Sequence, residues 1–188
     1  MALYYLPKIE FSFDLIYPVM MPWIAFGVAF LFFAGLGKIF GWSKSLIGCL
    51  ILTGGLGNTS FVGIPVIEAL YGQKGLETLI MVDLPGTFVV LSTLGILVAT
   101  IYSRGKNDFS IIFKKIFTFP PFIVFVIGIF LNLINFQIPE ALDQVFFKLS
   151  ATISPIALVS VGFQLKINKR SKHWKFLILG LSYQLLLL

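Results

Sequence analysis

The stretch Leu52–Val66, LTGGLGNTSFVGIPV, lies inside an apolar run but carries residues that helices usually exclude. Four of its fifteen residues are glycines, which weaken a helix and permit unusual φ/ψ angles. Pro65 lacks a backbone N–H, and its ring clashes with the carbonyl of Phe61, four residues earlier. Residues 58–60 add three polar side chains, Asn-Thr-Ser. We therefore predict that this run forms a broken helix.

The composition around this stretch is typical of a membrane protein. Of the 188 residues, 58% are hydrophobic and 12% are charged, and the mean hydropathy is +0.98. A soluble domain usually has about 25% charged residues, and one of this size could not bury so much apolar surface. The composition predicts an all-α fold, a polytopic bundle of transmembrane helices.

Apolar runs set the expected number of crossings. Runs long enough to span about 30 Å of hydrocarbon cover residues 15–36, 46–70, 79–101, 117–136 and 142–165, followed by an incomplete run at 174–188. No linker or low-complexity segment divides them. We therefore expect residues 1–188 to form a single, partial membrane transport domain that is truncated at both ends.

The basic residues between the runs predict an orientation. The five successive connections hold two, one, four, no and five basic residues, and the richest are the loop at about 103–115, near Arg104, and the loop near Arg170. Cytoplasmic loops carry an excess of Lys and Arg. The alternation predicts a multi-pass protein of the cell membrane with its N-terminal segment outside and these two loops in the cytoplasm.

Other function classes lack their sequence signatures. The net charge of +6 comes from short clusters between apolar runs, not from a basic stripe with exposed aromatics, so we expect no nucleic-acid partner. One histidine and the lone Cys49 provide no metal or disulfide framework. No phosphate loop or nucleophile elbow is present. We predict that the chain is not an enzyme and uses neither a metal nor a cofactor.

The broken run is the predicted site. A helix interrupted at mid-membrane offers helix ends and free carbonyls to a substrate or ion, as in many secondary carriers. Asn58 and Thr59 would donate hydrogen bonds to a carboxylate, Ser60 adds a hydroxyl, and Gly63 and Pro65 would maintain the break. The alternative is that the glycines only permit close helix packing.

Asp83 is the second predicted site residue, just inside the third run. An ionisable group within a membrane marks a functional site by default. Asp83 would accept a coupling proton or hold the broken helix. The alternative is a shallow position near the outer interface, in contact with water.

Two motifs carry a resemblance to a known family. The sequence GNTSFVGIPV at Gly57–Val66, with Leu70-Tyr71-Gly72 after it, resembles the auxin efflux carrier (AEC) family of plant PIN-type auxin exporters and bacterial malonate permeases. Ser154–Leu165 resembles that family's seventh helix. The resemblance implies ten helices in two inverted repeats of five, with broken, crossing fourth and ninth helices. This chain would supply the third to seventh helices and the start of the eighth.

The resemblance and the break together predict a secondary active transporter, a permease for small organic anions such as carboxylates or auxin-like acids. Its expected partners are the organic anion, the lipid bilayer, a coupling proton and a second copy of the chain in a homodimer. The alternative is a non-transporting membrane subunit or an inactive fragment of a carrier gene.

Overall fold

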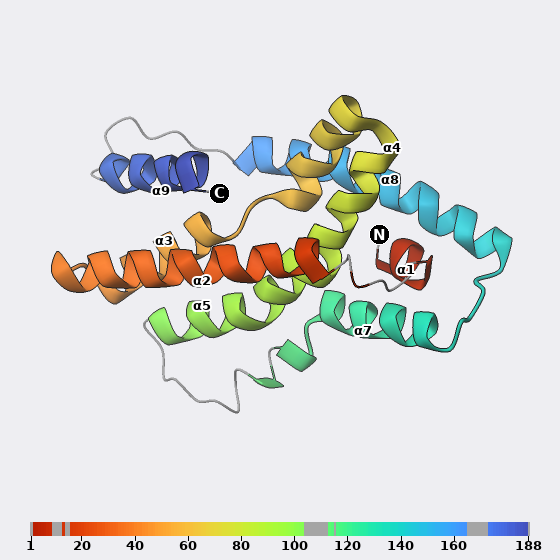
Figure 1. The fold of residues 1–188 in the computed structure, drawn as a ribbon, viewed down its shortest axis with the longest axis horizontal. Helices are drawn as coiled ribbons and strands as arrows, with labels where there is room; N and C mark the ends of the chain where they lie inside the picture. Colours follow the sequence, from red (N-terminus) through yellow and green to blue (C-terminus); the bar gives the residue numbers. More distant parts are fainter. Residues whose placement is uncertain are drawn as a thin grey trace.

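The computed structural model describes residues 2–8, 13, 16–103, 113–114, 116–164 and 173–187. Within these ranges the regular structure is entirely helical. Figure 1 shows long helices lying roughly along one direction, with α4 rising across them. The all-α fold predicted from the apolar runs is confirmed.

One group of helices packs around α3 (Lys44–Gly55). Its neighbours are α2 (Ile16–Ile39), α5 (Ile96–Tyr102) and α9 (Trp174–Leu187). Ser43 begins α3 as its N-cap, and the turn before it uses Gly41 at φ 64°, an angle that favours glycine. We call the contacts of α2 with α3 the α2–α3 interface.

The chain then breaks and continues through π-helical segments. After α3 come η3 (Thr59–Gly63), α4 (Ile64–Val82), η4 (Asp83–Phe88) and η5 (Leu91–Gly95), which leads into α5. Within α4 the direction changes at Gly72, where φ is 62° and ψ is −154°. Residues with a side chain rarely adopt these angles. Gly72 therefore ends one membrane-length stretch, and the next begins at Lys74.

The remaining helices form the other end of the molecule. Helix α7 (Pro120–Leu133) and helix α8 (Glu140–Gln164) follow each other through a turn, and α1 (Ala2–Tyr5) packs against both. The 3-10 turn η1 (Leu6–Lys8) lies on α7, where Asn132 Nδ2 donates to the carbonyls of Leu6 and Pro7 at 2.9 and 3.1 Å.

Three helical stretches of the described chain are long and apolar enough to cross a membrane: Ile16–Ile39, Lys44–Gly72 and Lys74–Tyr102. They overlap the predicted runs 15–36, 46–70 and 79–101. The second and third stretches are longer than the predicted runs, because only one residue separates them at the turn after Gly72. Helices α7, α8 and α9 lie within or near the other three runs. Most of the predicted loop 103–115 and the loop near Arg170 lie outside the described residues.

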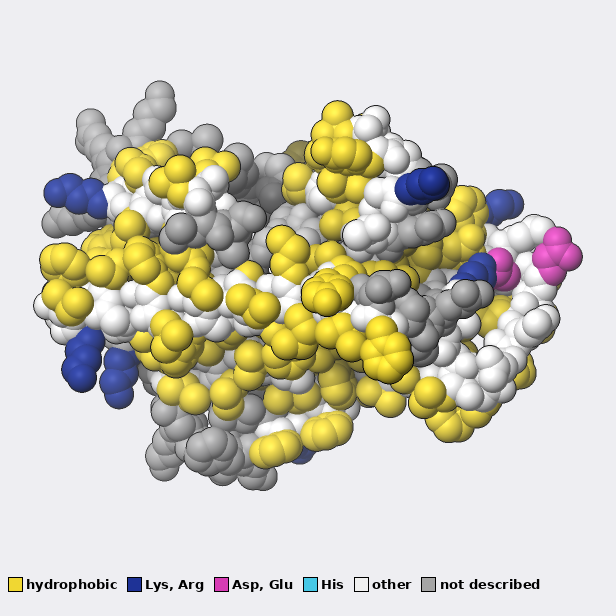
Figure 2. Space-filling view, viewed as in Figure 1, with side chains coloured by type: hydrophobic (Ala, Val, Ile, Leu, Met, Phe, Trp, Pro, Cys, Tyr) yellow, Lys and Arg dark blue, Asp and Glu magenta, His cyan; other side chains and the backbone are white. Residues whose placement is uncertain are grey.

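The surface of the described chain is mainly apolar. In Figure 2 hydrophobic side chains cover most of the visible face, and charged side chains gather toward the two ends. At one end, contacts between Trp42 and Phe176 join the start of α3 to the start of α9. Lys38, Lys44 and Lys175 belong to this end by their positions in α2, α3 and α9. This distribution suits a bundle whose middle lies in hydrocarbon.

Candidate functional site

The helix break is formed by residues 56–58, which have no helical structure between α3 and η3. Leu56 is extended at φ −120°, ψ 115°, and Asn58 begins η3 as its N-cap. The Asn58 Oδ1 accepts a hydrogen bond from the backbone N–H of Phe61 at 3.1 Å. This bond fixes the amide, while its two N–H donors have no acceptor among the described residues. Asn58 is exposed, so these donors can reach a bound molecule.

The two residues after Asn58 bind the carboxylate of Asp83. Thr59 Oγ1 donates to Asp83 Oδ1, and Ser60 Oγ lies 2.7 Å from both carboxylate oxygens. The three side chains form a cluster that joins η3 to η4, although they are 23 and 24 positions apart in sequence. We call Thr59, Ser60 and Asp83 the hydroxyl–carboxylate cluster.

Packing against α2 holds η4 in place. A Cβ on Gly86 would lie 2.9 Å from Pro22 Cγ and 3.2 Å from the Val19 carbonyl oxygen, so only glycine allows this close approach. Pro85 lacks a backbone donor, and the segment has the wider π-helical turn that often occurs at functional sites. As a result, Asp83 is only 4% exposed. The carboxyl group of Asp83 is thus enclosed by protein in the described structure.

The predicted breakers divide into two groups. Gly54 and Gly55 are helical and buried, and a Cβ on Gly55 would lie 2.9 Å from the Ala29 Cβ. These two glycines serve close packing of α3 against α2, which was the alternative to a helix-breaking role. Gly63 and Pro65 lie at the junction of η3 with α4, where Pro65 occupies the first turn of α4. Pro65 has no N–H, so it cannot continue the bonding by which the N–H of Ile64 donates to the carbonyl of Thr59 in η3.

Sequence reasoning missed Gln184 on α9. Its Nε2 donates to the carbonyls of Thr53 at 2.7 Å and Leu56 at 3.2 Å. These are carbonyls at the C-terminal end of α3, which the break leaves without a helical donor. The sequence did offer one signal, since Gln184 is a single amide inside an apolar run. Polar groups in membrane helices usually have a specific partner.

A cavity of 370 Å³ lies between the first turns of α4 and helix α8. Ile64, Pro65 and Glu68 of α4 face Phe147, Ser150 and Pro155 of α8, with Tyr4, Tyr5, Leu76 and Ala151 completing the lining. Burial raises the pKa of Tyr5, and the nearby Tyr4 and Glu68 raise it further, so its hydroxyl stays protonated at neutral pH. The volume and mostly apolar lining suit the body of a small organic molecule.

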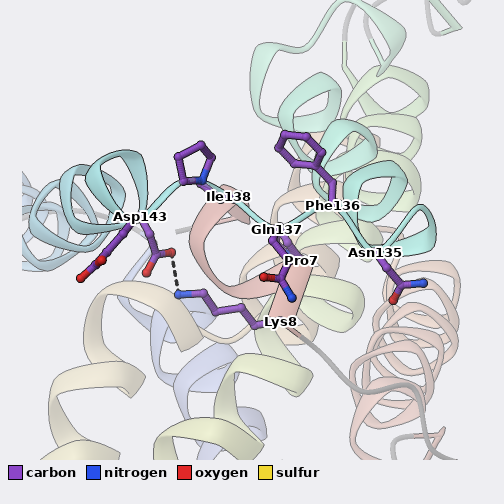
Figure 3. A pocket seen from close by; sticks show the side chains of 9 residues that line it. Pro7, Lys8, Asn135, Phe136, Gln137, Ile138 and Asp143 are labelled. Atoms are coloured by element: carbon purple, nitrogen blue, oxygen red, sulfur yellow. Dashed lines mark ion pairs between the residues drawn. The ribbon is translucent and has the colours of Figure 1, made fainter.

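A second cavity, of 680 Å³, opens between η1 and the turn from α7 to α8. Figure 3 shows Lys8 reaching toward Asp143, with which it forms an ion pair of 2.6 Å. Asn135 adopts a positive φ of 51° in that turn, which asparagine tolerates better than most residues. Since Lys8 is paired, this cavity offers no unpaired cation among its described lining residues to hold an anion.

Comparisons with known proteins agree with this description. A family model described as membrane transport protein matches residues 7–110. An uncharacterized transporter of Methanocaldococcus jannaschii is 34% identical over 134 residues, which are 69% of this chain and 42% of that protein. An uncharacterized transporter of Methanothermobacter thermautotrophicus is 31% identical over 112 residues, 59% of this chain and 35% of that protein. The chain thus spans less than half the length of these relatives. No solved structure matches.

The matched segment contains all of α2, α3, the break and the hydroxyl–carboxylate cluster. It covers more than half of the chain. The chain therefore belongs to the membrane transport protein family, the auxin efflux carrier family that the motif at Gly57–Val66 resembles.

Proposed function

We propose that this chain forms part of a secondary active transporter that moves small organic anions across the cell membrane. The observation that carries the proposal is the break at residues 56–58, which lies inside the membrane-length stretch Lys44–Gly72 and is followed by two hydroxyls that contact the buried carboxyl group of Asp83 in the next stretch. Irregular backbone at such a depth is tolerated where it lines a cavity or is enclosed by protein.

Two features of the break support an anionic substrate. The N-terminal end of the η3–α4 helix carries backbone N–H groups and the positive end of the helix dipole. The Asn58 amide adds side-chain donors beside them. The 370 Å³ cavity next to Pro65 supports the organic part of the proposal, because its aromatic and aliphatic lining suits a hydrocarbon body.

The proposal extends to coupling, orientation and assembly. Asp83 would take up the coupling proton, and the end of the bundle with Lys38, Lys44 and Lys175 would face the cytoplasm. The protein would act as a homodimer, which native mass spectrometry in detergent can test. The non-transporting alternative predicts no flux of any carboxylate.

Transport by Asn58 variants tests the proposal. The Asn58→Ser variant retains a side-chain oxygen that can cap η3 but loses the amide donors, whereas Asn58→Ala loses both. We expect uptake of radiolabelled phenylacetate and succinate into vesicles to fall at least tenfold in both variants. Membrane levels should match the unmodified protein.

The paired variants separate binding from capping. If Asn58→Ser transports normally and only Asn58→Ala fails, the side chain serves as a cap and does not bind substrate. Unchanged transport in both variants would contradict the assignment of Asn58. Gln144→Ala, an exposed amide on α8 far from the break in sequence, is the matched control and should transport normally.

A further inference from the structure

We propose that Asp83 and the transported carboxylate compete for the same two hydroxyl donors, so that an anion binds at the break only together with a proton on Asp83. This inference rests on the proposed function, since it takes the substrate to be an organic anion. It adds the coupling rule: one anion and one proton bind together.

The number of donors in the hydroxyl–carboxylate cluster carries the inference. A serine or threonine hydroxyl has one O–H donor and can accept two further bonds. Thr59 directs its O–H to Asp83 Oδ1, and Ser60 lies within hydrogen-bonding distance of both carboxylate oxygens. While Asp83 is charged, both donors are used. An incoming carboxylate would then find neither hydroxyl free to donate and would meet the negative charge of Asp83 beside them.

Protonation of Asp83 reverses this arrangement. The proton, taken from water, makes a neutral carboxyl group whose O–H can donate to the oxygen of Ser60 or Thr59. The two hydroxyls can then turn their own O–H groups toward the substrate carboxylate, beside the amide of Asn58. One anion and one proton add no net charge, so the loaded site carries one negative charge instead of the two it would carry without the proton, which lowers the cost of moving it through hydrocarbon.

No basic side chain offers another way to neutralise the anion in the described part of the cluster. The elements packed against η4 are α2, α4, η3 and η5. Their described ionisable residues are Tyr17 and Lys38 on α2 and Glu68, Tyr71 and Lys74 on α4. None of these forms an ion pair or hydrogen bond with Asp83 among the described contacts. The proposal assigns the compensating positive charge to a proton, which Asp83 itself can bind.

Calorimetry of phenylacetate binding tests the rule. Titrations of the purified protein in Tris and in HEPES, whose ionisation enthalpies differ, give the number of protons taken up per anion. We expect about one proton for the unmodified protein and none for Asp83→Asn, whose amide imitates the neutral acid. Phenylacetate remains ionised above about pH 5.5, since ordinary carboxyl pKa values lie near 4.

The pH dependence provides a second readout that needs no variant. Where Asp83 is charged in the free protein, affinity of the unmodified protein should fall about tenfold per pH unit, because one proton is linked to binding. The affinity of Asp83→Asn should stay constant. Glu140→Gln is the matched control: it removes an exposed carboxylate at the start of α8 that lines neither the 370 Å³ cavity nor the cluster, so proton uptake should remain about one.

The outcomes separate this inference from the proposed function. Binding of phenylacetate with no proton uptake and no pH dependence in the unmodified protein would overturn the shared-donor rule and leave the anion assignment standing. Absence of phenylacetate binding at every pH would overturn both. If Asp83→Asn does not fold, the pH dependence of the unmodified protein still decides.

Discussion

The α2–α3 interface and the hydroxyl–carboxylate cluster both bring helices close together, but with opposite chemistry. In the interface, Gly54 and Gly55 let α3 approach the buried rings and methyl groups of α2. In the cluster, Ser60 and Thr59 join η3 to η4 through hydrogen bonds to the carboxyl group of Asp83. Neighbouring parts of one glycine-rich stretch thus perform two tasks.

The comparison shows why glycine alone does not mark a site. The backbone at Gly54 is helical and tightly enclosed, whereas Gly57, three residues later, lies in the break with only the Thr59 Cγ2 atom near its missing side chain, at 3.9 Å. What separates them is the polar sequence that follows. Asn58 can cap a new helix, and this allows the break to occur there.

The largest expected effect is on the interface. A valine at position 54 would collide with the ring of Phe33, which is fully buried, so Gly54→Val should lower the free energy of unfolding by about 3 kcal/mol. Gly57→Ala should change it by less than about 0.5 kcal/mol. Thermal unfolding in detergent compares the two. Equal losses would contradict the distinction between packing and break glycines.

A smaller effect is expected in the cluster. Ser60→Ala removes the hydroxyl that lies 2.7 Å from both oxygens of the buried Asp83 carboxyl group, and should cost about 2 kcal/mol of unfolding free energy at pH 7, measured by chemical denaturation. Ser92→Ala is the matched control, because the Ser92 hydroxyl is buried and has no hydrogen-bond partner among the described residues. Its loss should be neutral or stabilising. A larger cost for Ser92→Ala would show that the cluster is not a special source of stability.

The smallest effect concerns the turn that separates the two long stretches. Gly72→Ala forces a side chain into a strained conformation and should cost about 1 kcal/mol or more. Gly35→Ala, in the middle of α2 with open space around it, should gain up to about 1 kcal/mol. Melting temperatures that move in the same direction would contradict the strain assigned to Gly72.

The sequence predicted the elements better than their contacts. The helical class followed from the apolar run lengths, and the presence of a break within Leu52–Val66 followed from its glycines, polar residues and Pro65, since these are local properties. The structure has the break at residues 56–58, before Pro65, which lies in α4. A role for Asp83 in holding the broken helix was one of two that the sequence left open, but its partners Thr59 and Ser60 were not predicted. Their contact depends on the turn at Gly72 and the wider π-helical turns of η4, which change which side chains share a face.

Contacts between residues far apart in the chain could not be predicted from the sequence for the same reason. Gln184 reaches the end of α3 from 131 residues away, so no spacing rule connects them. The roles of Gly54 and Gly55 were also undetermined, because a glycine that packs and a glycine that breaks a helix look alike until the neighbour, here Phe33 or open space, is known.

The central claim is that the break binds the anion, and thiol protection tests it most directly. A cysteine at Gly57, in a Cys49→Ser background, would lie exposed beside Asn58 without altering it. We predict that phenylacetate slows its reaction with a small thiol reagent at least fivefold at pH 6. A cysteine at Ser45, at the start of α3, should react at an unchanged rate. Equal reaction rates at position 57 with and without phenylacetate, under conditions where phenylacetate is transported, would contradict the account.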